Sequence, residues 1–127
     1  MKKILIVDDE KDLREILRIN LEGKGFECLL AEDGIKALEI VRENRPDLIV
    51  LDLMMPDLPG EEVCKSIKAD KETSSIPIIM LTSKTTDADK VVGRVIGADS
   101  YIFKPYDMHA LIENINKLLG EKYFFSP

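Results

Sequence analysis

Five short apolar runs alternate with amphipathic segments along this chain of 127 residues. A short aliphatic run is typical of a buried strand, and apolar residues at 3.6-residue spacing are typical of a helix. The repeated alternation predicts a parallel sheet that carries helices on both faces. The predicted strands are Lys3–Val7, Phe26–Ala31, Leu48–Leu51, Ile76–Leu81 and Ser100–Phe103.

Each predicted strand is followed by a segment with apolar residues at helical spacing, and glycine or proline residues such as Gly23, Pro46, Gly97 and Gly120 are the expected helix ends. Five such units predict an α/β domain with the flavodoxin-like doubly wound (βα)5 fold, its five parallel strands in the order 2-1-3-4-5.

We expect one domain over residues 1–120. Residues 121–127 are predicted to be a C-terminal tail or the start of a linker, and they include the aromatic run Tyr123, Phe124 and Phe125. The apolar helix positions are Leu13, Ile16, Leu17, Leu21, Ile35, Ala37, Leu38, Val41, Val63, Ile67, Ala88, Val91, Val92, Val95, Ile96, Leu111, Ile115, Leu118 and Leu119.

Composition narrows the function classes. The net charge is -6 and no basic stripe is present, so we expect no direct nucleic-acid binding by this domain. No run approaches the roughly 18 apolar residues of a membrane span, which predicts no membrane insertion. Cys28 and Cys64 are expected to be buried, reduced thiols, and the predicted location is cytoplasmic.

Carboxylates end two of the central strands. Asp8 and Asp9 follow the first strand and Asp52 follows the third, and in this topology both strand ends lie where the strand order reverses. Like charges about 4 Å apart repel by roughly 4 kcal/mol at an effective dielectric constant of 20. Protonation could relieve this repulsion, but Mg²⁺ is the more natural answer because it binds carboxylate oxygens and keeps positions open for phosphate.

Two further polar side chains follow neighbouring strands. Thr82 comes just after the fourth strand and Lys104 just after the fifth. A cation, a carboxylate nucleophile, a hydroxyl donor and an ammonium group together suit phosphoryl transfer, in which catalysis is mostly positioning and electrostatic stabilisation.

Each of these residues also has a plain structural interpretation. Asp8 or Asp9 could cap the following helix, Asp52 could begin a loop, and Lys104 could be an exposed lysine. Thr82 could be an ordinary threonine after a strand, and Tyr101 could pack at the sheet edge. Only their combination at the predicted strand ends favours a site.

This combination resembles the receiver domain of the bacterial two-component response regulators, over residues 1 to about 120. The motifs are the acidic pair Asp8 and Asp9, "DLMMPDLPG" around Asp52, Thr82, and "GADSYIFKPY" with Lys104. The resemblance implies that Asp52 accepts a phosphoryl group from the phosphohistidine of a sensor histidine kinase or phosphotransfer protein.

The resemblance also implies roles around Asp52. Asp9 and Asp52 would bind Mg²⁺ (or Mn²⁺) directly, Asp8 mainly through water, and the backbone carbonyl of Met54 would complete the protein ligands. Thr82 and Lys104 would each contact a phosphoryl oxygen. Tyr101 resembles the aromatic residue that switches with Thr82, and Pro105 the proline of a cis peptide bond.

The implied output is a conformational switch of the face made by the fourth helix, fifth strand and last helix. Lys90, Arg94, Tyr101 and Phe103 are the residues predicted to meet an unknown output partner or C-terminal effector domain there. A homodimer on activation is also possible on this interpretation. We expect a phosphoacceptor signalling domain and no enzyme beyond its own phosphorylation and dephosphorylation. The alternatives are a degenerate, phosphorylation-independent interaction module and a Mg²⁺-dependent aspartyl-phosphate phosphatase.

Overall fold

The computed structural model of the chain describes residues 1–83 and 97–124. Within these residues the five strands form one parallel sheet in the order β2-β1-β3-β4-β5, which confirms the predicted topology. The predicted fourth helix, which includes Lys90 and Arg94, lies outside the described residues. The elements are β1 (Lys3–Val7), α1 (Lys11–Glu22), β2 (Glu27–Ala31), α2 (Gly34–Asn44), β3 (Leu48–Asp52), α3 (Gly60–Ala69), β4 (Ile78–Thr82), β5 (Ser100–Phe103) and α5 (Met108–Phe124).

Four strand boundaries differ from the prediction. The strands β3 and β4 each extend one residue further than predicted, to Asp52 and Thr82, and β2 and β4 begin later than predicted for local reasons. The N–H of Phe26 donates to the carbonyl of Leu21 at the end of α1, so β2 begins one residue later than predicted. The N–H of Ile76 donates to the carbonyl of Thr73 in a turn, and Pro77 has no N–H to donate, so β4 begins at Ile78.

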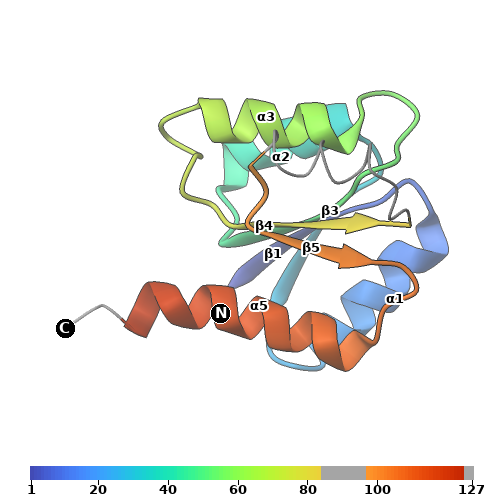
Figure 1. Cartoon of the computed structure of the whole chain (residues 1–127), viewed down its shortest axis with the longest axis vertical. Helices are drawn as coiled ribbons and strands as arrows, with labels where there is room; N and C mark the ends of the chain where they lie inside the picture. Colours follow the sequence, from blue (N-terminus) through green and yellow to red (C-terminus); the bar gives the residue numbers. More distant parts are fainter. Residues whose placement is uncertain (84–96, 125–127) are drawn as a thin grey trace.

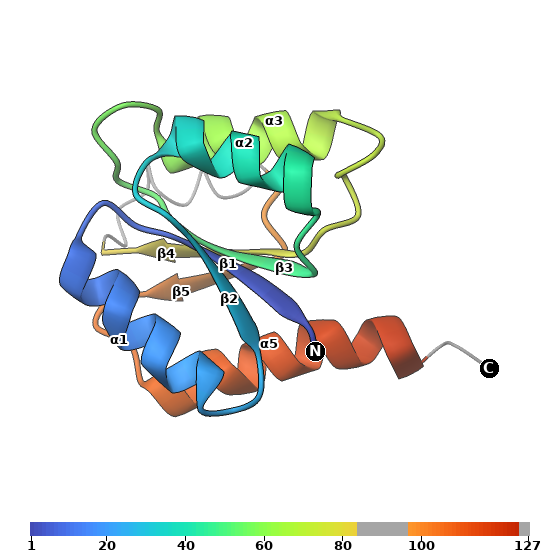
Figure 2. The same cartoon turned by 180° about the vertical axis from the view of Figure 1, so that it is seen from behind.

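Helices cover both faces of the sheet (Figures 1 and 2). The helices α2 and α3 lie on one face, and α1 and α5 lie on the other. Two groups of buried side chains result, one under each helix layer. The first includes Leu5, Leu51 and Val63, and the second includes Ile4, Leu17 and Ile115.

The end of α5 does not lie where the sequence predicted. The helix continues past Gly120 to Phe124, so the predicted stop at Gly120 was wrong. Gly120 does not adopt the left-handed backbone conformation that commonly ends a helix, whereas Gly97 does, with a φ of 75°. A glycine inside a helix costs only about 1 kcal/mol relative to alanine, which the helix can tolerate.

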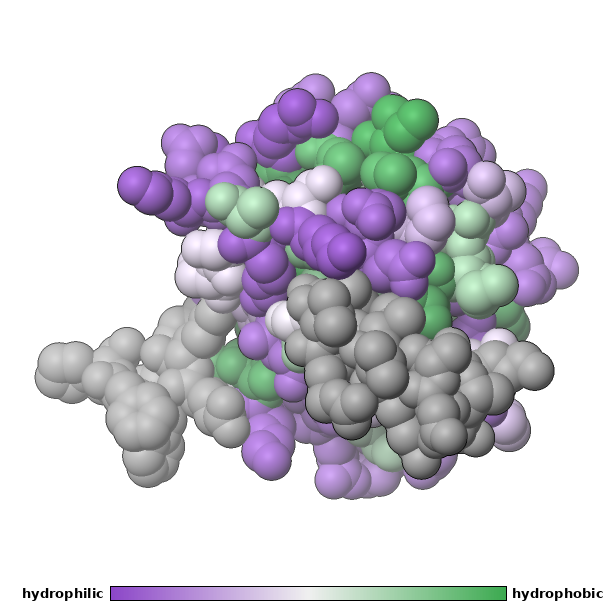
Figure 3. Space-filling model, turned by 45° about the horizontal axis from the view of Figure 1, so that its top comes forward, coloured by the Kyte–Doolittle hydropathy of each residue, from purple (hydrophilic) through white to green (hydrophobic). Residues whose placement is uncertain are grey.

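The surface is mostly hydrophilic on the side shown in Figure 3, with small separate apolar areas. Ile16 and Ile35, which fit the predicted helix periodicity, are 49% and 59% exposed and therefore do not belong to the core. Cys64 is buried and Cys28 half-buried, and burial raises the pKa of both thiols to about 11. None of the helices in the described ranges combines the length and hydrophobicity needed to cross a bilayer.

Candidate functional site

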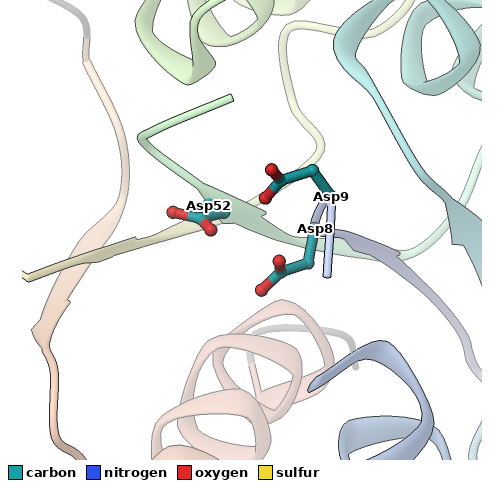
Figure 4. Close-up of side chains that lie close together, drawn as sticks. All are labelled: Asp8, Asp9 and Asp52. Atoms are coloured by element: carbon teal, nitrogen blue, oxygen red, sulfur yellow. The ribbon is translucent and has the colours of Figure 1, made fainter. Parts of the chain in front are cut away.

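The pairing of β1 with β3 brings the predicted acidic residues together. Val7 and Leu51 are partners in this ladder, so the residues that follow them, Asp8 and Asp52, lie side by side at the carboxyl ends of β1 and β3. Carboxylate oxygens of Asp8, Asp9 and Asp52 all lie within 4.8 Å of one another. Figure 4 shows the three carboxylates directed to the same side, Asp8 and Asp9 from the end of β1 and Asp52 from β3.

The three acids differ in their exposure to solvent. Asp8 is 1% exposed and Asp52 is 4% exposed, whereas Asp9 is exposed. The cluster therefore has two buried carboxylates and one that faces water, and this arrangement leaves a side open to an ion or a phosphoryl group.

Asp8 is held by the start of α1. Its Oδ1 accepts a hydrogen bond from the N–H of Glu10 at 2.9 Å, and its backbone carbonyl accepts one from Nη1 of Arg14 at 2.7 Å. The N-cap of α1 is Glu10, whose side chain makes no capping bond. Neither Asp8 nor Asp9 is the N-cap residue, so capping alone does not account for the pair.

Burial raises the pKa of Asp8 from its usual 3.8 to about 6. The hydrogen bond from Glu10 opposes this change, while the negative charges of Asp52 and Asp9 add to it and Lys104 partly offsets it. The ionised cluster thus has an unbalanced negative charge, which a divalent cation would neutralise.

Both carboxylate oxygens of Asp52 have donors. Oδ1 accepts from the N–H of Met54 at 3.1 Å, and Oδ2 accepts from Nζ of Lys104 at 3.2 Å. Lys104 reaches this position because its own N–H donates to the carbonyl of Thr82 at 2.7 Å, which extends the pairing of β4 with β5. The predicted lysine is therefore in contact with the predicted phosphoacceptor.

Thr82 and Tyr101 lie on the neighbouring strands β4 and β5. Thr82 is 3% exposed at the last position of β4, where it is level with Phe103. Tyr101 is half-buried and packs against the side chains under α2 and α3, and its burial raises the pKa of its phenol. The Lys104–Pro105 peptide bond is cis, as the resemblance implied.

Sequence reasoning missed three contributors to the site. Arg14 had no predicted role, although its Nη1 donates to the backbone carbonyl of Asp8. Tyr106 is half-buried near the acids: burial and the charges of Asp8 and Asp52 raise its pKa. Gly60 had no predicted role in the site, but a Cβ there would collide with the carbonyl oxygen of Asp52.

The donor set fits a hard divalent cation. Three carboxylates within reach of one another, of which one is exposed, provide the oxygen ligands that Mg²⁺ prefers and leave room for water. Among the described residues no cluster of three or more histidine, cysteine or acidic side chains offers an alternative metal site.

Comparison with known proteins agrees with this geometry. A family model described as the response regulator receiver domain matches residues 4–116. The DNA-binding response regulator MtrA of Mycobacterium tuberculosis is 46% identical over 118 residues, which are 93% of this chain and 50% of that protein. The chain thus spans about half the length of the curated relatives it matches.

Solved structures give the same result. The signal receiver domain of a signal transduction histidine kinase from Syntrophus aciditrophicus is 32% identical with a TM-score of 0.92, and the match covers 95% of this chain and 92% of that one. The receiver domain of the sensor histidine kinase PA1611 from Pseudomonas aeruginosa, solved with a magnesium ion coordinated in the active site cleft, is 27% identical with a TM-score of 0.87 and coverages of 94% and 98%. This chain therefore belongs to the response regulator receiver domain family of two-component signalling proteins.

Proposed function

We propose that Asp52 accepts a phosphoryl group from the phosphohistidine of a sensor histidine kinase or phosphotransfer protein, in a Mg²⁺-dependent reaction. A carboxylate oxygen of Asp52 attacks phosphorus while the P–N bond to the histidine breaks, and the imidazole leaves with that electron pair. The observation that carries the proposal is the buried Asp52 carboxylate in contact with Lys104 and within 4.8 Å of two further acids.

The surrounding residues have complementary roles in this proposal. Lys104 would transfer its hydrogen bond from the carboxylate to a phosphoryl oxygen, and the hydroxyl of Thr82 would donate to another. Asp8, Asp9, Asp52 and the backbone carbonyl of Met54 would hold the metal, directly or through water. Mg²⁺ (or Mn²⁺), when bound, would neutralise charge on the carboxylates and on the transferred group. The likeness to the PA1611 receiver with its coordinated magnesium supports this assignment.

The output is proposed to follow from a switch in Thr82 and Tyr101. Their movement would change the face formed by the fourth helix, β5 and α5, and so control a partner or an output domain, with a homodimer as one form of the activated state. The MtrA relatives are named DNA-binding response regulators, so control of DNA binding by a region other than this domain is the output we propose to test first. A cytoplasmic location follows from partnership with a kinase phosphohistidine.

The proposed receiver occupies residues 1–120, with residues 121–127 as a tail or the start of a linker. The helix α5 crosses that boundary and ends at Phe124, so the tail would begin as a continuation of the helix. In Figure 1 the end of α5 lies at the opposite end of the sheet from the carboxyl ends of the strands. A region attached there would leave the phosphoacceptor edge open to a kinase.

The intact mass of the protein after incubation with acetyl phosphate tests the proposal. We expect one added phosphoryl group that requires Mg²⁺, is absent from Asp52→Asn, and is retained by Asp12→Asn. Asp12 is a matched control because it is an exposed acid in the first turn of α1 outside the cluster. A folded wild-type protein that binds Mg²⁺ but gains no phosphoryl group would favour the phosphorylation-independent interaction module. Hydrolysis of a generic phosphomonoester would instead favour the phosphatase.

A further inference from the structure

The loop of residues 53–59 connects the phosphoacceptor to α3 and contributes directly to the site. The N–H of Met54 donates to Oδ1 of Asp52 at 3.1 Å, so a shift of this loop would move the carboxylate. Met54 is also the residue whose carbonyl is proposed as a metal ligand. Its side chain is 68% exposed, so it does not anchor the loop by packing.

The carboxylate of Asp57 ties this loop to a different element. Its Oδ1 accepts from the N–H of Gly34 and its Oδ2 from the N–H of Ile35, each at 3.1 Å. These are the first two amides of α2, which have no acceptor within the helix. An ionised carboxylate is a strong acceptor for such amides and is stabilised at a helix N-terminus.

The surroundings of Asp57 favour its ionised form, and α2 lies close to the loop. Partial desolvation works against ionisation of Asp57, but four backbone amides, including those of Gly34 and Ile35, lower its pKa below the usual value. A Cβ at Gly34 would lie 2.7 Å from the carbonyl oxygen of Leu58, so only glycine lets α2 approach the loop this closely.

The far end of the loop is equally constrained. The N–H of Gly60 donates to the carbonyl of Leu53 at 2.9 Å, and a Cβ at Gly60 would collide with the backbone of Asp52 and Leu53. The loop is therefore fixed between the N-termini of two helices, α2 through Asp57 and α3 through Gly60.

We propose that Asp57 is a positioning residue for the phosphoacceptor site: by binding the N-terminus of α2, it holds Asp52 and the Met54 carbonyl in their metal-binding arrangement. This inference rests on the proposed function, because it assigns Asp57 a role in the site that function requires. Asp57 contacts neither metal nor phosphoryl group, and acts through the loop.

The structure provides a matched control for this proposal. Asp33 also caps α2, since its Oδ1 accepts from the N–H of Lys36 at 2.8 Å, but it belongs to the segment just before the helix and not to the site loop. Removal of either carboxylate leaves amides of the same helix without an acceptor. Only removal of Asp57 also releases the loop.

The test compares wild-type protein with Asp57→Ala, Asp57→Asn and Asp33→Ala. Calorimetric titration gives the dissociation constant for Mg²⁺, and labelling by acetyl phosphate at varied Mg²⁺ gives both the half-saturating concentration and the maximal rate. Thermal unfolding gives the stability of each variant. We expect Asp57→Ala to raise the Mg²⁺ dissociation constant about tenfold, the lower end of the effect typical of groups that orient metal ligands.

The two controls separate positioning from stability. Asp33→Ala should lower the melting temperature as Asp57→Ala does but leave the Mg²⁺ dissociation constant close to the wild-type value. Asp57→Asn should be intermediate, because a neutral amide has one oxygen acceptor where the carboxylate has two. A saturating Mg²⁺ concentration should restore most of the labelling rate of Asp57→Ala.

The failures of the two proposals are distinguishable. Wild-type Mg²⁺ affinity in Asp57→Ala, or an equal loss of affinity in Asp33→Ala, would overturn the role of Asp57 even if labelling of the wild type is normal. Conversely, a wild-type protein that binds Mg²⁺ but is never labelled would overturn the proposed function, while a weaker Mg²⁺ affinity in Asp57→Ala alone would still support the positioning role.

Discussion

The interior of the sheet and the edge formed by the carboxyl ends of its strands belong to the same strands, but burial affects stability in opposite ways in these two regions. In β1 and β3 the aliphatic side chains, such as Ile6 and Val50, are fully buried and packed between helix layers. Two residues further along the chain from Ile6 and Val50, Asp8 and Asp52 are almost as well buried, yet both are acidic. Burial stabilises the fold in the interior and costs free energy at the edge, a cost that the proposed metal ion would offset.

The magnitudes support this contrast. A fully buried aliphatic side chain contributes about 1.5–3 kcal/mol relative to an exposed one. A buried carboxylate with raised pKa works against folding at neutral pH, at about 1.4 kcal/mol for each unit of the shift. Three predictions test this contrast, and they are given in order from the largest expected effect on stability to the smallest.

Truncation in the interior should have the largest effect on stability. Leu51 is fully buried, directly before Asp52. We expect Leu51→Ala to lower the free energy of unfolding by about 2–5 kcal/mol, because it leaves a cavity between packed layers. Urea unfolding measures this value, and Ile19→Ala, at a 61% exposed position on α1, should change it by less than about 0.5 kcal/mol. Equal losses in both variants would contradict the description of the core.

Added volume behind Asp52 should be the next most damaging change. In Gly60→Ala the new methyl group would meet backbone atoms of Asp52 and Leu53, which cannot rotate away as a side chain could. We expect a loss of about 1–3 kcal/mol on urea unfolding, as is typical of overpacking, together with slower labelling by acetyl phosphate.

Gly120→Ala is the control for this substitution. No atom lies within 4 Å of a Cβ at Gly120, and the residue is inside α5. This variant should be unchanged or up to about 1 kcal/mol more stable. A Gly60→Ala protein with wild-type stability and labelling would show that the close approach is not required.

Removing the charge of Asp8 should have the smallest effect on the free energy of unfolding, and it should increase that free energy. Asp8→Asn keeps an oxygen acceptor for the N–H of Glu10 but removes a charge from the cluster. Without Mg²⁺ at neutral pH, we expect the variant to be more stable than wild type by on the order of 1–2 kcal/mol, and to bind Mg²⁺ more weakly. Urea unfolding measures the stability, and calorimetric titration measures the Mg²⁺ affinity. An Asp8→Asn protein that is less stable than the wild type without Mg²⁺ would contradict the claim that the buried charge of Asp8 costs folding free energy.

The sequence predicted the topology and the convergence of the acidic residues, because both depend on strand order. Short aliphatic runs such as Leu48–Leu51 are typical of buried strands. In the predicted strand order the first and third strands are neighbours, so Asp8 and Asp52 were expected to converge at their carboxyl ends. The contacts that fix the site were not predictable in this way. Asp57 reaches α2 across 23 sequence positions, and the need for Gly60 arises only when two backbone segments approach in three dimensions.

The end of α5 shows a second reason for a failed prediction. Gly120 satisfies the local pattern of a helix stop, yet whether a glycine ends a helix depends on the conformation that follows it, which one residue type does not determine. Ile16 and Ile35 also fit the local apolar spacing of a helix, but this spacing did not predict that both side chains are exposed.

The most direct test of the central claim is the difference in unfolding free energy between Asp8→Asn and wild type, measured at about pH 4 and about pH 7.5, with and without Mg²⁺. The pKa of Asp8 is about 6 in the folded protein against 3.8 in the reference state. Between these values the folded state binds more protons than the unfolded state, so the wild type loses stability as pH rises. The comparison between variants removes the contributions of acids outside the cluster of Asp8, Asp9 and Asp52.

We predict that the stability advantage of Asp8→Asn is small at pH 4, develops as pH rises through 6, and shrinks or reverses when Mg²⁺ saturates the wild type. A difference that does not change with pH or Mg²⁺ would contradict the claim that this edge holds buried charge for a metal-dependent site.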